Sequence, residues 1–461
     1  MACSVSLSQL VSRLSAHSYL ADSYLQTVAT GINTDTRHLQ PGDVFVALRG
    51  DRFDGHQFVT QAIAQGAVAA IVDHSFSETI TLNETANLPI LSVDNTLTAY
   101  QTIAQWWRSQ FTMPVIAVTG SVGKTTTKEL ISAVLSTQGH VLKSQANFNN
   151  EIGVPKTLLE LDTTHNFAVV EMGMRGMGEI SLLSQIARPD IAVITNVGTA
   201  HIGRLGSEQA IAEAKCELLR EMPAASVAVL NYDNSRLMET AARVWQGKTI
   251  TYGLEGGDLQ GKLLDAMTLQ VEDVTLPLPL PGRHNAFNYL AALAVAKVLQ
   301  IDWSPLMQGL SIELPQGRAR RYALPNDIVL LDETYNAGLE SMTAALQLLA
   351  DTPAKRRIAV LGTMKELGDR SIAFHQQVGA LVQQLNLDGL LILADAAESQ
   401  ALAEGAWPLA AEQFSHPDAV VQRLTALMQP GDRILFKASR AVGLDQVVDR
   451  IRTHPQNQDL G

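Results

Sequence analysis

Short apolar runs alternate with amphipathic stretches through the middle of the chain. Strand-like runs cover residues 115–120, 167–172 and 190–196, and a helical pattern over 124–135 follows the first of them. A second helical pattern, rich in alanine, covers residues 286–299. Nearly continuous apolar strands that alternate with helices are typical of a parallel sheet covered on both faces. The middle third is therefore predicted to be an α/β domain.

The two flanking thirds show the same alternation. Near the start, apolar runs cover residues 42–50 and 67–73, and residues 98–110 read as a helix with Ile103, Trp106 and Trp107 on its apolar side. The last third repeats strand-like runs separated by helical stretches, which predicts another α/β domain. These runs cover residues 327–334, 357–363, 388–395 and 432–439.

Chain length and punctuation divide the protein into three parts. A chain of 461 residues holds about three domains at roughly 150 residues each. Met113-Pro114 interrupts the pattern before the first middle strand, and LPQGRARRY follows residue 312. We therefore expect three α/β domains, over residues 1–112, 113–312 and 313–461.

Composition narrows the class of protein. Hydrophobic residues make up 46% of the chain, and 34 basic against 46 acidic residues give a formal net charge of −12. This charge disfavours a general nucleic-acid binder, so an anionic ligand must meet a local cluster of basic groups or a metal ion. Cys3 and Cys216 are too few for a disulfide framework or a four-cysteine zinc site. Without a membrane-length apolar run or a secretory signal, the sequence predicts a soluble, cytoplasmic protein with no membrane span.

The segment VTGSVGKTTTKE (Val118–Glu129) carries the sharpest chemical signal. It follows a predicted strand and opens a predicted helix, so backbone N–H groups and the helix N-terminus can hold phosphate oxygens. Lys124 can reach the β- and γ-phosphates and the Thr125 hydroxyl can bind Mg²⁺. Val118 stands where the full G-x-x-x-x-G-K-[ST] pattern has glycine, so the first glycine is shifted to Gly120. The predicted nucleotide-binding residues of this loop are Gly120, Ser121, Val122, Gly123, Lys124, Thr125 and Thr126.

Two glycine-containing segments each have an alternative interpretation. The phosphate-loop segment could be an accidental glycine-lysine turn, but the preceding strand, the GKT string and the following helix together disfavour that. GMRGMG (Gly173–Gly178) could form a dinucleotide-binding loop. Its spacing does not fit G-x-G-x-x-G, so we predict a tight turn there.

The phosphate-loop segment and several others resemble the Mur ligase family, the ATP-dependent amide ligases of peptidoglycan precursor synthesis. The resemblance extends over the whole chain. It implies an N-terminal UDP-binding α/β domain, a central ATPase domain built on a parallel sheet, and a C-terminal Rossmann-like α/β domain. The matching segments are residues 34–58, 147–155, 281–288, 331–342, 364–368 (MKELG) and 437–440.

The resemblance assigns a metal site to residues that are ambiguous by themselves. Glu171 ends a strand beside the phosphate loop, where a buried carboxylate needs a cation or another partner. His201 could be an exposed loop residue, and Lys215 a solvated helix lysine. In the family, the matching residues hold Mg²⁺ together with Thr125, and the lysine is carbamylated. The resemblance implies that Lys124, His201 and Lys215 serve catalysis.

The remaining site residues are predicted from position and resemblance together. Asn285 and Asn288 offer amides to the base or for positioning, Arg318 could reach the γ-phosphate, and Asp332 suits ribose hydroxyls unless it is only a turn residue. The other predicted substrate-binding residues lie at the two ends of the chain, and those of the last domain could instead be surface charges. They are Lys437 and Arg440 for a substrate carboxylate, and Thr34, Asp35 and Arg37 at the uridine end.

Three functions are compatible with a phosphate loop in such a chain. A guanine-nucleotide switch should carry an N-K-x-D motif, which we do not find. A folylpolyglutamate-synthetase-like ligase would lack the N-terminal segment. Among Mur ligases, those that add diaminopimelate as the third residue carry D-N-P-R, which is absent here. MKELG instead matches the member that joins D-alanyl-D-alanine to UDP-N-acetylmuramoyl-tripeptide with ATP and Mg²⁺, and we expect a monomer.

Overall fold

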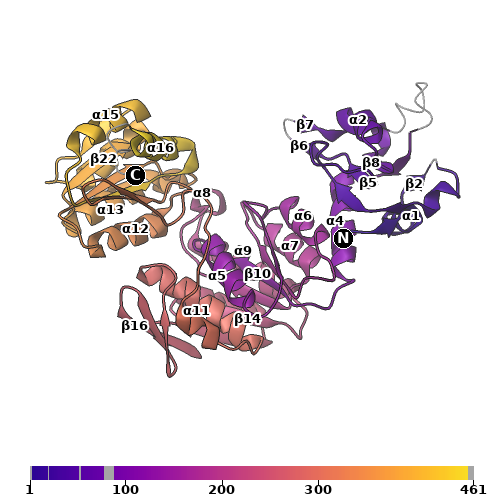
Figure 1. Cartoon of the computed structure of the whole chain (residues 1–461), viewed down its shortest axis with the longest axis horizontal. Helices are drawn as coiled ribbons and strands as arrows, with labels where there is room; N and C mark the ends of the chain where they lie inside the picture. Colours follow the sequence, from indigo (N-terminus) through magenta and orange to yellow (C-terminus); the bar gives the residue numbers. More distant parts are fainter. Residues whose placement is uncertain (1–2, 19, 51–52, 77–87, 455–461) are drawn as a thin grey trace.

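The computed structural model describes residues 3–18, 20–50, 53–76 and 88–454. Residues 51 and 52, part of the N-terminal segment that carries the family resemblance, lie outside this range. Figure 1 shows three bodies along the chain, with the middle one between the N-terminal and C-terminal ones. Each of the three is built on its own principal sheet.

The N-terminal body contains a five-stranded sheet. Its order is β2-β9-β8-β5-β4, with β2 antiparallel to β9 and the other neighbours parallel. The strands are β2 (His17–Ser18), β4 (Gly31–Asn33), β5 (Asp43–Val46), β8 (Ala69–Asp73) and β9 (Ile90–Val93). Two short strand pairs and two helices accompany them: β1 (Val5–Ser6) with β3 (Val28–Ala29), β6 (Arg49–Gly50) with β7 (Phe53–Asp54), α1 (Leu7–Leu14) and α2 (Val59–Ala64).

Helix α4 (Thr96–Arg108) connects the first body to the second. It packs against α1 and also against two helices of the middle body, α6 (Gly153–Leu159) and α7 (Glu179–Ala187). Buried Arg108 donates to the carbonyl of Ala187 at 3.1 Å and pairs with Asp190 at 2.8 Å. These bonds fix the end of α4 to the middle body.

The middle sheet has nine strands in the order β11-β12-β10-β13-β14-β15-β16-β17-β18. Neighbours are parallel as far as β16, and β17 and β18 extend the sheet as antiparallel strands. The sequence pattern predicted the parallel part but not this extension. The strands are β10 (Val115–Thr119), β11 (Val141–Lys143), β12 (Phe167–Glu171), β13 (Ile191–Ile194), β14 (Val227–Asn231), β15 (Lys248–Gly253), β16 (Leu259–Asp265), β17 (Thr268–Val271) and β18 (Val274–Pro277).

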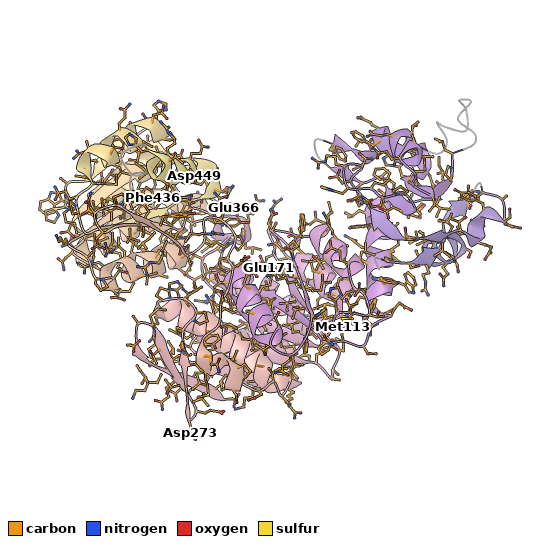
Figure 2. All side chains as sticks on the ribbon, in the orientation of Figure 1. Met113, Glu171, Asp273, Glu366, Phe436 and Asp449 are labelled. Carbon is orange, nitrogen blue, oxygen red and sulfur yellow. The ribbon has the colours of Figure 1, made fainter. Side chains whose placement is uncertain are left out.

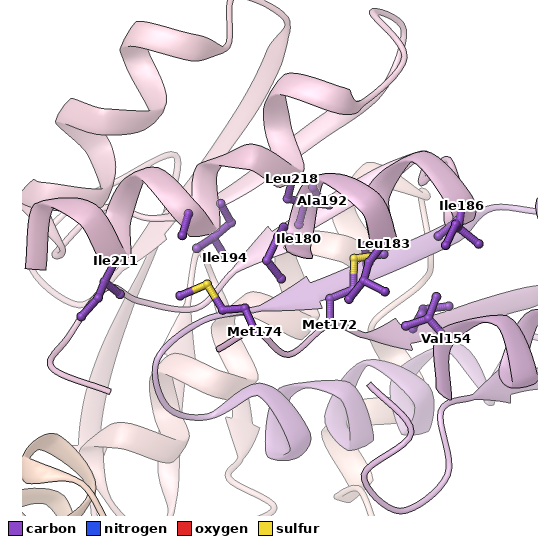
Figure 3. Packing of buried hydrophobic residues seen from close by; sticks show 14 of the residues in the cluster. Val154, Met172, Met174, Ile180, Leu183, Ile186, Ala192, Ile194, Ile211 and Leu218 are labelled. Carbon is purple, nitrogen blue, oxygen red and sulfur yellow. The ribbon is translucent and has the colours of Figure 1, made fainter. Parts of the chain in front are cut away.

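Alternate residues of β10 point into two separate cores. Val115 and Ala117 belong to a cluster that includes residues of α6, α7 and α9 (Glu208–Glu221). Figure 3 shows part of this packing, where Ile180 and Leu183 of α7 lie over the sheet. The intervening residues of β10 join a cluster with α5 (Lys124–Leu135) and α11 (Arg283–Val298). Since both faces are covered, the apolar run of β10 is continuous.

The C-terminal sheet has the order β19-β20-β24-β21-β22-β23. Only β19 is antiparallel to its neighbour. Its strands are β19 (Arg320–Leu324), β20 (Ile328–Asp332), β21 (Arg356–Gly362), β22 (Gly389–Leu393), β23 (Glu412–Phe414) and β24 (Asp432–Lys437). Its helices are α12 (Leu339–Asp351), α13 (Ser371–Gln384), α14 (Ala396–Gly405), α15 (Pro417–Leu427) and α16 (Leu444–Thr453). The predicted α/β class with parallel sheets is thus confirmed.

Candidate functional site

The loop after β10 lies where the strand order of the middle sheet reverses. Strands β12 and β11 lie on one side of β10, and β13, β14 and β15 lie on the other. In open α/β sheets, ligands bind outside the carboxyl ends of the strands at such a switch point. Register places Glu171 of β12 opposite Val118, so its carboxylate lies beside the loop.

The loop from Gly120 to Gly123 has a backbone that requires glycine at both ends. Gly120 has φ 152° and Gly123 has φ 83°. A Cβ at Gly120 would lie 1.9 Å from Oγ1 of Thr195, and one at Gly123 would lie 2.5 Å from Oδ1 of Asn288. The shifted first glycine is therefore needed where it stands.

Asn196, just after β13, holds the loop in place. Its carbonyl accepts from the N–H of Ser121 at 3.0 Å, and its Oδ1 accepts from the N–H of Val122 at 3.0 Å. Its amide and the Thr195 hydroxyl both donate to the carbonyl of Val122. The first N–H groups of α5, beginning with Lys124, have no acceptor within the helix and face the same region. They are suited to an anion.

Lys124 folds back onto the loop. Its Nζ donates to the carbonyl of Gly120 at 2.8 Å. Burial lowers the pKa of Lys124, the positive charge of Arg318 lowers it further, and Glu171 opposes both effects. Two cations that repel one another at a switch point favour an anionic ligand between them.

Glu171 is 3% exposed and has one oxygen unsatisfied. Oε1 accepts from the amide of Asn149 at 2.8 Å, whereas Oε2 is buried without a hydrogen-bond partner. The ammonium of Lys128 is 4.0 Å from Oε2. A buried carboxylate oxygen without a donor is costly, and a cation bound to it would remove that cost. Figure 2 shows Glu171 in the middle body.

Lys215 lies on α9 and is 1% exposed, so the interpretation as a solvated helix lysine is wrong. Within the described ranges no hydrogen bond or ion pair is found for its Nζ. Burial and, next, the charge of Lys124 lower the pKa of Lys215 well below its ordinary value. Lys215 is therefore close enough to the phosphate loop for the charge of Lys124 to affect it, although it comes about 90 residues later in the chain.

His201 is at the N-cap of α8 (Ile202–Leu205) with φ 67°. Its Nδ1 lies 2.5 Å from Oε2 of Glu366, which belongs to the C-terminal body. Burial lowers the pKa of His201, and the positive charges of Lys124 and Lys215 lower it further, against the effect of Glu366. His201 is thus paired across two bodies and is not a free loop residue.

Asn285 and Asn288 brace the start of α5. Asn288 accepts from the hydroxyl of Thr127 at 3.1 Å and donates to Oδ1 of Asn285 at 3.2 Å. Asn285 donates in turn to the carbonyl of Pro281 at 2.8 Å. Their amides are engaged with the protein, which favours the positioning role over direct contact with the base, at least for Asn288.

A pocket lies between the start of α11 and the C-terminal sheet. Asn285 and Asp332 both line it, together with Arg321 and Glu333. Asp332 ends β20, is buried, and accepts from the N–H and hydroxyl of Thr334 through Oδ1. A carboxylate oxygen accepts hydrogen bonds, so Oδ2 is chemically suited to a ribose hydroxyl.

Three cations surround Tyr335 and the end of β24. Arg318 stacks on the Tyr335 ring at 3.9 Å, and Arg440 lies 5.8 Å from the same ring. The Nε of Arg318 is buried without a partner. Lys437 is buried and donates to the carbonyl of Asn336 at 2.9 Å, and burial lowers its pKa. Arg440 is largely exposed, with only a 3.6 Å pairing to Asp445.

The predicted uridine-end residues follow β4. Asp35 and Arg37 pair with each other at 2.6 Å, and this pairing lowers the pKa of Asp35 to about 2. Arg37 is exposed, and Thr34 is half-buried. Among the described residues, no hydrogen bond or ion pair joins these three residues to the phosphate-loop site.

Sequence reasoning missed several residues of the site. Asn149 and Glu340 lie inside segments that match the family, so their positions were available, but nothing in the sequence gave their partners. Glu340 accepts from the N–H of Thr199 at 2.5 Å and from its hydroxyl at 3.1 Å. Glu333 accepts from the N–H of Ala319 at 3.1 Å, and burial raises its pKa. The contact between Thr199 and Glu340 joins residues that are 141 positions apart in the chain.

Comparison with known proteins agrees with this geometry. Models for the Mur ligase family catalytic domain, the Mur ligase middle domain and the Mur ligase glutamate ligase domain match residues 28–108, 118–296 and 317–440. A UDP-N-acetylmuramoyl-tripeptide–D-alanyl-D-alanine ligase from Synechocystis sp. is 60% identical over 91% of each chain. The chain belongs to the Mur ligase family.

Solved structures of Mur ligases have the same three-body architecture. MurF from Acinetobacter baumannii superposes with a TM-score of 0.87 at 31% identity, over 98% of this chain and 99% of that one. MurF from Thermotoga maritima in complex with ADP gives 0.79 at 30% identity, over 94% and 98%. In the described part of the chain, no helix is long and apolar enough to cross a membrane.

Proposed function

We infer that this Mur ligase joins D-alanyl-D-alanine to UDP-N-acetylmuramoyl-tripeptide and converts ATP to ADP and phosphate. The observation that carries this inference is the 60% identity, over 91% of both chains, to the Synechocystis enzyme with that name. The convergence of Lys124, Lys215 and Arg318 at a switch point supports it, because their mutual repulsion favours a polyanionic ligand. The product is the UDP-muramyl-pentapeptide precursor of the cell wall.

The reaction needs ATP because a carboxylate does not condense with an amine unaided. Transfer of the γ-phosphoryl group makes an acyl phosphate, and attack by the dipeptide amine then releases phosphate. Both steps concentrate negative charge, which Lys124 and Arg318 are suited to stabilise. The unpartnered Nε of Arg318 supports this role, since a buried donor is costly without an acceptor.

The donor set fits Mg²⁺. Glu171 offers an oxygen that has no hydrogen-bond partner, Thr125 offers a hydroxyl at the start of α5, and His201 and Lys215 lie in the same electrostatic neighbourhood. Among the described residues, no three His, Cys, Asp or Glu side chains group into a metal cage. Mg²⁺ is usually held by one or two carboxylates and substrate phosphates, so no such cage is required. When bound, the ion neutralises charge that develops on the phosphoryl oxygens.

We propose that Lys215 is carbamylated. Its depressed pKa favours the neutral amine, whose lone pair can form a bond to the carbon of CO₂ while the nitrogen loses a proton. The proton goes to water, and the side chain beside Lys124 becomes negatively charged. The carbamate would attract Lys124 and add oxygens for the metal.

The other site residues divide between the nucleotide and the acceptor. Asp332 and Asn285 line a narrow crevice between the domains. We propose that the nucleoside binds here when the crevice widens, and that Asp332 binds the ribose. The phosphates would lie on the N–H groups and side chains of residues 120–126, which Asn288 braces. Lys437 or Arg440 is proposed to bind the terminal carboxylate of D-alanyl-D-alanine by a charge-assisted hydrogen bond.

The N-terminal body is proposed to hold the UDP part of the donor, with Thr34, Asp35 and Arg37 near the uridine. Its domain is proposed to end near residue 112 and the middle one near residue 312. We further propose a cytoplasmic location, because ATP and UDP-linked donors are cytoplasmic compounds, and we propose that the protein is a monomer. Static light scattering of the purified chain measures the oligomeric state.

One assay separates this function from its alternatives. Phosphate release should require ATP, UDP-N-acetylmuramoyl-tripeptide and D-alanyl-D-alanine together. A nucleotide switch would hydrolyse nucleotide without either substrate. A folylpolyglutamate-synthetase-like enzyme would respond to a folate and glutamate instead. Release that ignores omission of the dipeptide would contradict the proposed function.

A further inference from the structure

The loop between β13 and α9 is held by the C-terminal body. Glu340, at the start of α12, accepts two hydrogen bonds from Thr199. Glu366 contacts His201 and Arg204 through its carboxylate. The segment that carries the proposed metal ligand His201 thus has partners from outside its own domain.

The contact at Glu366 involves backbone as well as side chains. The carbonyl of Glu366 accepts from the N–H of Gly203 at 3.0 Å. A Cβ at Gly203 would lie 2.8 Å from that carbonyl oxygen and 2.5 Å from the nitrogen of Gly368, so only glycine allows this approach. His201 and Glu366 both adopt positive φ, 67° and 64°. Strained backbone persists only where the surrounding structure enforces it, and it clusters at functional sites. Strain on both sides of this contact therefore points to a functional role.

We propose that Glu366 is a positioning residue that fixes the ring of His201 for metal binding. An ionised carboxylate can only accept, so the 2.5 Å contact requires the proton on Nδ1. In the neutral ring, which the lowered pKa of His201 favours, the lone pair is then on Nε2, the nitrogen available to a cation. Metal-binding histidines commonly donate their other N–H to a carboxylate in this manner. The inference rests on the proposed role of His201 in the metal site.

The arrangement makes a middle-domain metal ligand dependent on the C-terminal domain. Arg204 pairs with the other oxygen of Glu366, at 3.2 Å, and does not contact the oxygen that faces His201. Glu366 is the third residue of MKELG, the segment that distinguishes the acceptor class in the sequence. MKELG would therefore position a metal ligand, in addition to distinguishing the acceptor class in the sequence.

The test compares Glu366→Gln with Arg204→Met. The glutamine keeps the size and the backbone contact to Gly203 but removes the charge that fixes the tautomer. The methionine breaks the same interdomain ion pair without touching His201. Mn²⁺ binding to the ADP-loaded full-length protein is titrated by electron paramagnetic resonance. We expect Glu366→Gln to bind Mn²⁺ about tenfold more weakly, and Arg204→Met to stay within about twofold of wild type.

A second readout needs no metal. ¹⁵N-labelled histidine, with His201→Gln for assignment, should show the Nδ1–H tautomer at His201 in wild type and in Arg204→Met. Glu366→Gln should show a mixture of tautomers. Wild-type Mn²⁺ affinity and tautomer in Glu366→Gln would overturn the inference, provided that His201→Gln weakens Mn²⁺ binding. If His201→Gln also binds Mn²⁺ normally, the proposed metal role of His201 fails instead.

Discussion

The middle and C-terminal sheets both contribute site residues at the carboxyl ends of their strands. The two sets of side chains differ in how firmly the surrounding protein holds them. In the middle domain, Asn196 fixes the phosphate loop and Asn149 fixes Glu171, both through bonds within the domain. In the C-terminal domain, Lys437 is held by the carbonyl of Asn336, and Arg440 is largely exposed. A phosphate can dock on a prepared surface at the first face. A carboxylate at the second face must replace the backbone carbonyl that Lys437 now contacts, or pair with the exposed Arg440.

The difference suggests an order of events. Groups that are already fixed cost little entropy when a ligand binds, so the nucleotide half should bind independently of the acceptor. The acceptor half should become ordered when the two domains close, with the hinge expected near residue 312. Figure 2 places Glu366 on the side of the C-terminal domain that faces the middle one, where closure would act.

Removal of Lys124 should give the largest loss. Lys124→Ala removes the charge closest to the phosphate loop, and we expect turnover to fall about a thousandfold. The fold should persist, because within the described residues the lysine makes a single hydrogen bond, to Gly120 of the loop. Phosphate release and thermal unfolding measure the two effects. Activity within a few-fold of wild type would remove the loop from the mechanism.

Substitution of Lys215 tests whether the metal site of the middle domain needs a carbamylated lysine. Lys215→Ala should lose about a hundredfold in turnover if a carbamate supports the metal. Added formate or acetate should restore part of the activity by supplying the missing anion. Lys143→Ala is a control, since that lysine pairs with Glu129 and lies partly exposed. Absence of rescue, together with an unmodified Lys215 by ¹³C-bicarbonate NMR, would exclude the carbamate.

The phosphate loop of the middle domain could be predicted from a short stretch of sequence. The helix expected over residues 124–135 is α5 as observed, because the strand, the glycines and the amphipathic pattern lie within one short segment. Lys215 and His201 could be assigned only through family resemblance. Burial of Lys215 and the pairing of His201 with Glu366 depend on packing between elements that are distant in the chain. No periodicity in the sequence encodes such contacts, nor did it distinguish the antiparallel strands β17 and β18 from a loop.

An intermediate effect is expected at the nucleoside end, which lies between the two faces. Asp332→Ala should raise the KM for ATP about tenfold, the equivalent of one hydrogen bond to a ribose hydroxyl, and leave kcat nearly unchanged. Thr334→Val is the matched control, because it removes the hydroxyl hydrogen bond that Asp332 accepts within its own turn and keeps the one from the N–H. Equal KM values in both variants would mean that Asp332 acts only on the turn.

The smallest effect is expected far from both faces. In Arg37→Ala the pKa of Asp35 should rise from about 2 to its ordinary value, because the pairing that lowers it is gone. A depressed carboxyl pKa stabilises the folded protein above the ordinary pKa, and this contribution disappears as pH falls toward 2. The KM for the UDP-linked donor should rise a few-fold, with kcat for ATP turnover unchanged. An NMR titration of Asp35 and donor kinetics provide the two measurements.

The identity of the acceptor tests the whole account most directly. Two pairs are offered with ATP: UDP-N-acetylmuramoyl-tripeptide with D-alanyl-D-alanine, and UDP-N-acetylmuramoyl-dipeptide with a free diamino acid. ADP formation and the mass of the peptide product are measured for each. We expect turnover with the first pair only, and a product heavier than the tripeptide by the two alanine residues. Turnover with the second pair and none with the first would contradict the assignment.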